Sequence, residues 1–119
     1  MNNDPWYTNP RWRRIRACIL RRDDYLDQEA KRFGLVREAE VVHHIFPRQE
    51  YPQYQYEPWN LISLSRMTHN EMHDRDSDEL SEKGKDLLRR TCVRMGMPVP
   101  EKYTFQKKGG HKKRDKYYT

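Results

Sequence analysis

Four of the five histidines lie in one window of the sequence, between Val41 and His73. His43 and His44 are adjacent at the end of an apolar run, whereas His69 and His73 are four residues apart. Side chains at positions i and i+4 of a helix share one face, so His69 and His73 can reach the same ion. On an extended segment, His43 and His44 must point to opposite faces. The spacing suggests that one of the adjacent histidines binds a metal while the other acts on a substrate.

The length and composition restrict the class of protein. A chain of 119 residues with 34% hydrophobic and 35% charged residues predicts one small domain with a modest core. A metal site is a candidate for the additional stabilisation that small cores need. There is no apolar run of membrane-spanning length and no signal-peptide pattern, so we expect a soluble, cytoplasmic protein without a membrane partner. Cys18 and Cys92 are too few and too far apart for a zinc knuckle or a disulfide framework, and we expect buried thiols.

The positive charge is concentrated at the two ends of the chain. Residues 101–119 contain seven lysines and arginines against two acidic residues, which gives +5 of the total net charge of +6. A second cluster near the N-terminus contains Arg11, Arg13, Arg14, Arg16, Arg21 and Arg22. Basic ends on a small domain indicate a polyanionic partner, with nucleic acid the first candidate. The alternative is a solvated surface that only aids solubility.

The elements that must position the histidines follow from periodicity and from capping residues. In order, we expect helices at 10–22 and 24–33, a strand at 40–46, a loop at 47–58, a strand at 61–64, a helix beginning at Ser65 or Thr68 that carries His69 and His73, and a helix at 81–95. These boundaries predict a loose segment at 1–8, a domain at 9–100 with its central unit at about 40–76, and a basic flexible tail at 101–119.

The ordered set His43, His44, Asn60, His69 and His73 resembles the ββα-metal active site of HNH endonucleases. The flanking residues agree, and the match covers roughly residues 6–75. The chain is most similar to the small, free-standing HNH proteins of bacteriophages and prophages. The resemblance implies an α+β fold, in which a ββα-metal (His-Me finger) core with flanking helices forms a single small domain.

The resemblance also implies roles for these five residues in metal-dependent hydrolysis of DNA phosphodiester bonds, as a nick or a double-strand break. His43, His69 and His73 are expected to bind a divalent metal ion, which is Zn, Ni, Mn, Co or Mg; imidazole nitrogens suit magnesium least. His44 is expected to be the general base, because a neutral imidazole accepts a proton from water at physiological pH. The Asn60 amide is expected to bond the backbone across the loop and hold the His44 strand.

One departure from the family pattern concerns a second metal. Many relatives carry two Cys-x-x-Cys pairs that bind a structural zinc behind the active site. The corresponding positions here are Asp27 and Ala30, followed by Ser65 and Thr68. We therefore expect no four-cysteine zinc site, and we expect packing or side-chain hydrogen bonds to hold the turn from strand to helix.

DNA is the expected partner, and several basic residues are candidates to contact it. Arg48 and Arg66 flank the histidines and can reach phosphates, although a solvent-facing role is an equal alternative for both. The candidates in the tail are Lys107, Lys108, Lys112 and Lys113. By resemblance alone, the protein would act in a bacterial host cell, encoded by a phage or prophage, and would work beside the phage packaging (terminase) machinery.

Two other functions fit the same residues. A non-catalytic DNA-binding module could use the histidines as a structural metal site, in which case chelation would unfold the protein, and DNA would be bound without any turnover. A toxin-like nuclease could cut RNA or any nucleic acid without preference. The adjacency of His43 and His44 argues against a purely structural site, which needs no free imidazole beside its ligands.

Overall fold

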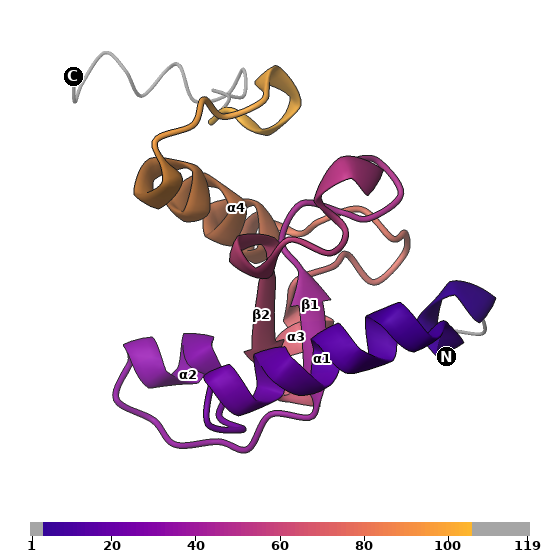
Figure 1. Cartoon of the computed structure of the whole chain (residues 1–119). Helices are drawn as coiled ribbons and strands as arrows, with labels where there is room; N and C mark the ends of the chain where they lie inside the picture. Colours follow the sequence, from indigo (N-terminus) through magenta and orange to yellow (C-terminus); the bar gives the residue numbers. More distant parts are fainter. Residues whose placement is uncertain (1–3, 106–119) are drawn as a thin grey trace, which may run out of the picture.

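A two-stranded antiparallel sheet forms the centre of the protein (Figure 1). The computed structural model describes residues 4–105. Strand β1 (Val41–His44) pairs with β2 (Leu61–Leu64), so that His43 lies opposite Ile62 and His44 lies opposite Leu61. Successive residues of a strand point to opposite faces, and residues directly opposite on the partner strand share a face. The two adjacent histidines therefore belong to different layers of the molecule.

Helix α1 (Pro10–Arg22) covers the face of the sheet to which His44 belongs. The Asn9 side chain accepts a hydrogen bond from the Trp12 backbone N–H, and Pro10 occupies the first turn, which is a favourable start for a helix. The buried side of α1 packs against the sheet in a cluster that contains Trp12, Ile19, Leu20, Ala39, Val42 and Leu61. Cys18 lies on the opposite, exposed side of α1, so the expectation of a buried thiol was wrong there.

Helices α3 (Arg66–Glu71) and α4 (Glu82–Met95) belong to the other side of the sheet, and the main core lies there. Its buried members are Ile45, Phe46, Leu64, Met72, Leu80, Leu87, Leu88, Cys92 and Tyr103. With two strands followed by α3 and with the other helices packed around this unit, the structure confirms the predicted α+β fold with a ββα core. None of the described helices is long and apolar enough to cross a membrane.

Two helices are shorter than the sequence predicted. Helix α2 spans only Gln28–Arg32, because Asp27 caps it with extended backbone and Asp24 and Tyr25 before it have left-handed φ values of 58° and 59°. Helix α3 ends at Glu71, so His73 lies just beyond it, in a bridge with Leu80. The last turn of α3 is instead closed by the Met72 N–H, which donates to the His69 carbonyl at 3.0 Å, and His73 pairs with Leu80.

Both ends of the described chain pack onto the domain. Residues 4–8 were expected to be loose, but Pro5–Thr8 forms a short 3-10 helix, η1. The Asp4 carboxylate caps this helix by accepting the Trp6 backbone N–H at 2.9 Å. Residues 101–105 were assigned to the tail, yet Glu101–Tyr103 forms a second 3-10 helix, η4, and Tyr103 is buried with its hydroxyl donating to Glu50. Aromatic burial accounts for both differences.

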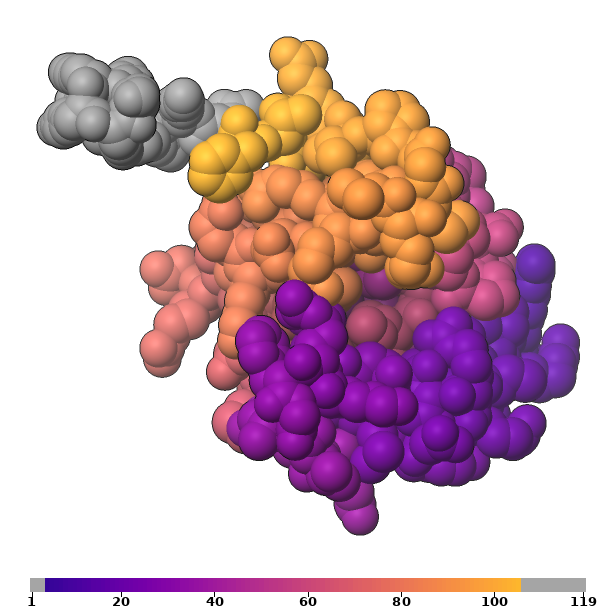
Figure 2. Space-filling view, turned by 90° about the vertical axis from the view of Figure 1, so that its left-hand side faces the viewer, coloured from indigo at the N-terminus to yellow at the C-terminus, as the bar shows by residue number. Residues whose placement is uncertain are grey.

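A groove with a volume of about 340 Å³ separates α2 from α4. Figure 2 shows this hollow between the purple α2 region and the orange α4. Its lining residues are Gln28, Glu29, Arg32, Ile62, Leu87, Arg90, Thr91 and Arg94, and none of them is a histidine. Glu29 bridges the two sides, with its carboxylate 2.8 Å from the Arg90 guanidinium. The groove is therefore a partly neutralised surface between two helices, and no histidine within residues 4–105 lines it.

Candidate active site

Three histidines from different segments converge on one point. His43 comes from β1, His69 from α3, and His73 from the segment after α3. One ring nitrogen from each lies within 4.8 Å of the others, and the ring centroids are 5.2 to 5.5 Å apart. The predicted set is thus brought together although His73 lies outside α3, in a bridge with Leu80.

The electrostatics of the cluster suit a cation. Burial lowers the pKa of His43 well below 6.5, and the neighbouring histidine charges lower it further. Burial, together with the charges of His73 and Arg66, lowers the pKa of His69 to about 4. Both rings are therefore neutral at physiological pH and offer lone pairs. His43 Nε2 is buried without a hydrogen-bond partner among residues 4–105, which costs free energy unless its lone pair binds a metal ion. These residues fit a divalent metal bound through nitrogen.

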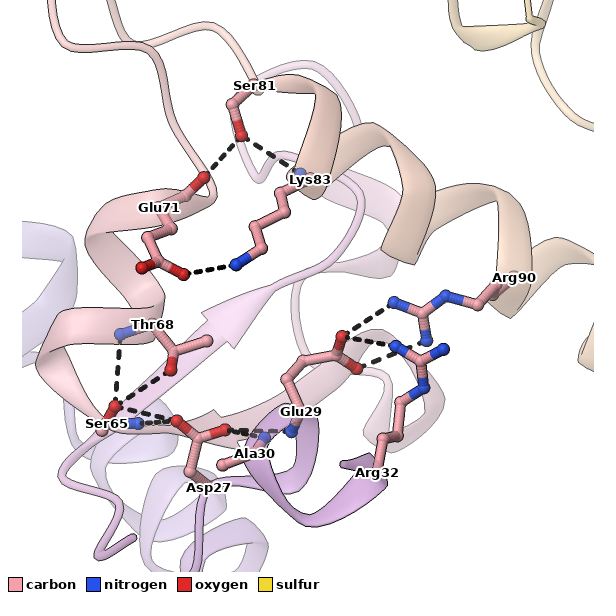
Figure 3. Close-up of polar contacts among 11 residues, drawn as sticks. Asp27, Glu29, Ala30, Arg32, Ser65, Thr68, Glu71, Ser81, Lys83 and Arg90 are labelled. Carbon is pink, nitrogen blue, oxygen red and sulfur yellow. Dashed lines mark hydrogen bonds and ion pairs between the residues drawn. The ribbon is translucent and has the colours of Figure 1, made fainter. Parts of the chain in front are cut away.

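The beginning of α3 is held by a buried polar network (Figure 3). The Asp27 carboxylate is fully buried, and one of its oxygens accepts the backbone N–H groups of Glu29 and Ala30, both at 2.9 Å. The other oxygen accepts the backbone N–H of Ser65 at 3.0 Å and its hydroxyl at 2.8 Å. Ser65 also lies 3.1 Å from the Thr68 hydroxyl and caps α3. The four positions where relatives carry cysteines therefore meet through hydrogen bonds.

Hydrogen bonding to the carboxylate has an electrostatic consequence. Burial by itself raises the pKa of Asp27, but hydrogen bonds from Thr68, Ala30 and Ser65 outweigh it and hold the pKa below 3.8. Asp27 is therefore ionised at neutral pH, and its negative charge is stabilised inside the protein. The joint between α2 and the turn from β2 to α3 depends on that charge.

The end of α3 is held by the N-terminus of α4 (Figure 3). The Ser81 hydroxyl donates to the Glu71 carbonyl at 2.6 Å, and the Ser81 N–H donates to the Met72 carbonyl at 2.9 Å. Lys83 adds an ion pair with the Glu71 side chain at 2.6 Å. Gly84 permits this close approach, since a Cβ there would lie 2.3 Å from the Met72 carbonyl oxygen. These bonds satisfy two carbonyls at the C-terminal end of α3 and hold that end against the first turn of α4.

His44 lies on the α1 face, outside the three-histidine cluster. Its ring stacks on Trp12, with centroids 5.0 Å apart and planes inclined by 23°, and contacts Trp6 and Tyr7 edge-on. Only 8% of the residue is exposed. His44 Nε2 is 3.1 Å from the Gln55 carbonyl oxygen, to which it can only donate. In that tautomer, Nδ1 carries the lone pair and is the nitrogen able to accept a proton.

Burial and nearby positive charge keep the His44 imidazole neutral. Burial lowers its pKa to about 4, against the opposing effect of the hydrogen bond to Gln55. The positive charge of Arg48 lowers it further, and protonation of His69 would act in the same direction. His44 is therefore neutral at physiological pH, which a general base requires.

Asn60 connects the segments around His44. It is fully buried, and its Oδ1 accepts the Phe46 N–H at 2.7 Å. Its Nδ2 donates to the Phe46 and Tyr54 carbonyls, both at 3.2 Å. The side chain thus ties the end of β1 and the long loop to the start of β2.

The candidate DNA-contacting residues lie in different environments. The Arg48 side chain is 13% exposed and forms an ion pair with Asp4, whereas Arg66 is 70% exposed and lies 3.9 Å from Glu40. The four tail lysines Lys107, Lys108, Lys112 and Lys113 lie outside the described residues. Sequence reasoning missed the Gln55 carbonyl, for which no side-chain signal exists, and the cover over His44 formed by Trp6 and Tyr7, for which the aromatic pair itself was the signal.

Comparisons with known proteins agree with this geometry. Neither the protein-family models nor the curated proteins contain a match. The crystal structure of the HNH endonuclease of the deep-sea thermophilic bacteriophage GVE2, determined with manganese ion, is similar over 55% of this chain and 71% of that chain, with 31% identity and a TM-score of 0.54. The shared ββα arrangement and the histidine cluster place this chain in the HNH endonuclease family.

Proposed function

We propose that this protein is a metal-dependent endonuclease that hydrolyses phosphodiester bonds of DNA. The observation that supports this most is the convergence of His43, His69 and His73, with an unpartnered buried nitrogen on His43, beside a neutral His44 that belongs to no ligand set. The similarity to a phage HNH endonuclease and the net charge of +6 both favour a nucleic acid substrate.

In this proposal, His43, His69 and His73 hold a divalent cation. When bound, the cation supplies Lewis-acid stabilisation of the charge that develops on a scissile phosphate and its leaving oxygen. The donor set is all imidazole, which favours manganese, zinc, nickel or cobalt over magnesium. The structure of the similar phage HNH endonuclease was determined with manganese, so manganese is the first ion to test.

His44 is the proposed general base. Its Nε2–H is directed at the Gln55 carbonyl, so the lone pair of Nδ1 can take a proton from an attacking water. Trp12 and the Gln55 carbonyl fix the plane and the tautomer of the ring. Asn60 keeps the end of β1 and the long loop in register, which maintains the position of the Gln55 carbonyl relative to His44. The protein thus supplies a positioned base and a place for the cation.

DNA affinity is proposed to come from backbone contacts. Arg48, Arg66 and the tail lysines are the candidates, since guanidinium and ammonium groups bind phosphates without reading the base sequence. Such contacts predict binding that weakens with added salt.

Cleavage of supercoiled plasmid with a panel of divalent ions tests the proposed function. Wild-type protein should nick or linearise DNA with manganese or another suitable ion and should be inactive with a chelator. His44→Ala should lower the rate by roughly 10²- to 10⁴-fold, because it removes the proton acceptor. His111→Ala is the matched control, since we assign that histidine no role. Equal cleavage with and without chelator, or a fully active His44→Ala, contradicts the proposal, and preferential cutting of a parallel RNA substrate would redirect it.

A further inference from the structure

His44 is covered by a segment that comes from the N-terminus. We call residues 4–8 the N-terminal cover. Trp6 lies edge-on to His44 with centroids 5.6 Å apart, stacks on Tyr56 at 5.4 Å, and leans on Trp12 at 5.1 Å. Tyr7 completes the cover at 6.4 Å from the His44 ring. A water and a phosphate must reach a general base, so this cover stands where a substrate would approach.

Arg48 holds the cover in place. Its guanidinium lies 4.4 Å above the Trp6 ring and 5.1 Å from the Tyr7 ring, and its Nη2 donates to the Asp4 carboxylate. The same carboxylate caps the Trp6 backbone N–H at 2.9 Å. Asp4 therefore performs two tasks at once, because it begins η1 and also attaches η1 to Arg48.

The bonding of Arg48 is incomplete in a way that points to a ligand. Within residues 4–105, the side-chain nitrogens and oxygens that are buried without a hydrogen-bond partner are His43 Nε2 and Arg48 Nε. The first belongs to the proposed cation site. Guanidinium groups match phosphates through two parallel N–H bonds, and a phosphate offers more acceptor oxygens than a carboxylate. Arg48 also lies close enough to His44 for its charge to lower the pKa of that ring.

From these contacts we infer that Arg48 is a binding site for a substrate phosphate and that the Asp4 carboxylate occupies it as an internal competitor, keeping the N-terminal cover over His44 until DNA displaces it. The inference rests on the proposed function. It assigns the cover a regulatory role, since exchange of carboxylate for phosphate at one guanidinium both binds the substrate and uncovers the base. In the absence of DNA, His44 would then be uncovered in only a small fraction of the molecules.

A double-mutant cycle on DNA affinity tests the inference. Binding of a fluorescent DNA duplex by the full chain is measured by anisotropy in a chelator, so that no cleavage intervenes. Asp4→Asn should tighten binding about five-fold, as expected for release of a partly exposed ion pair, and Arg48→Ala should weaken it. In the Arg48→Ala background, the gain from Asp4→Asn should disappear.

Asp24→Asn is the matched control, because it removes the same charge at an exposed position after the other end of α1, where asparagine tolerates the left-handed backbone. A gain from Asp4→Asn no larger than that of Asp24→Asn would overturn the inference, as would a gain that persists without Arg48. Failure of the proposed function would appear as absent cleavage in every metal. Failure of this inference appears in the binding cycle alone, so the two failures are distinguishable.

Discussion

The two faces of the central sheet carry adjacent histidines, but different kinds of contacts surround them. The face of His43 is organised by polar joints, with Asp27 at one end of α3 and Ser81 at the other. The face of His44 is organised by aromatic packing, in which Trp12 stacks on the imidazole and Trp6 covers it. One peptide bond therefore separates two environments.

The difference teaches how one short strand can support two tasks. Ligands for a cation must have fixed directions, and hydrogen bonds to α3 provide those directions. A base must stay neutral, hold one tautomer and remain unliganded, which a ring stack and the Gln55 carbonyl provide on the opposite side. Alternation along the strand places His44, the proposed base, on the face opposite His43, a proposed ligand.

The largest expected effect is on metal binding, and it tests whether the two faces of the sheet have separate roles. His69→Ala should lower manganese affinity by more than about 100-fold, since loss of a direct ligand exceeds the cost of losing an outer partner. His44→Ala should leave that affinity unchanged, because its ring is on the other face. Isothermal titration calorimetry on both variants gives the answer. If His44→Ala weakened manganese binding as much as His69→Ala, the two faces would form one ligand set and the division of roles would be wrong.

The next effect concerns the polar joint on the His43 face. Asp27→Asn should lower the free energy of unfolding by about 3 kcal/mol at pH 7, because the buried oxygens that accept N–H groups lose their charge and one becomes a donor. Urea unfolding measures the change, with Asp24→Asn as the exposed control. A stability equal to that of the control would show that packing, rather than this carboxylate, holds the turn.

The same joint predicts a pH dependence. The pKa of Asp27 is below 3.8 in the folded protein, so its contribution to stability is fully present above pH 3.8 and is lost as the pH falls through the lowered value. Wild-type protein should therefore lose its stability advantage over Asp27→Asn in acid. A difference between the two that stays constant from pH 7 to pH 2 would contradict the assignment of that carboxylate.

The smallest expected effect comes from deleting residues 106–119, and it tests whether either face depends on them. This segment contains six basic residues and Asp115, which gives a net charge of +5. Deleting the segment should weaken DNA binding about ten-fold at low salt and reduce its salt dependence, because phosphate contacts are lost. Metal affinity and thermal stability should not change. The deletion must begin after Phe105, since Tyr103 belongs to the core. An unchanged DNA affinity would exclude this tail as a contact.

Local patterns anticipated the elements better than their ends. Asn9-Pro10 marked the start of α1, Gly96 marked the end of α4, and β-branched residues marked the first strand. Helix α3 was predicted too long because His73 pairs with Leu80 in a bridge instead of continuing the helix. Helix α2 was predicted too long because the cap at Asp27 is stabilised by Ser65, a residue 38 positions away. Bonds between distant segments leave no periodicity in the sequence.

The residue types identified the histidines as candidate ligands, and alternation along a strand was sufficient to separate His43 from His44. The convergence of His73 with His43 and His69 came from the tertiary structure, since His73 lies outside α3. Folding in three dimensions settled which groups surround each ring. The Gln55 carbonyl, the aromatic cover and the Asp4–Arg48 ion pair are contacts between segments far apart along the chain. Such contacts depend on packing, so they exist only once the whole domain has closed.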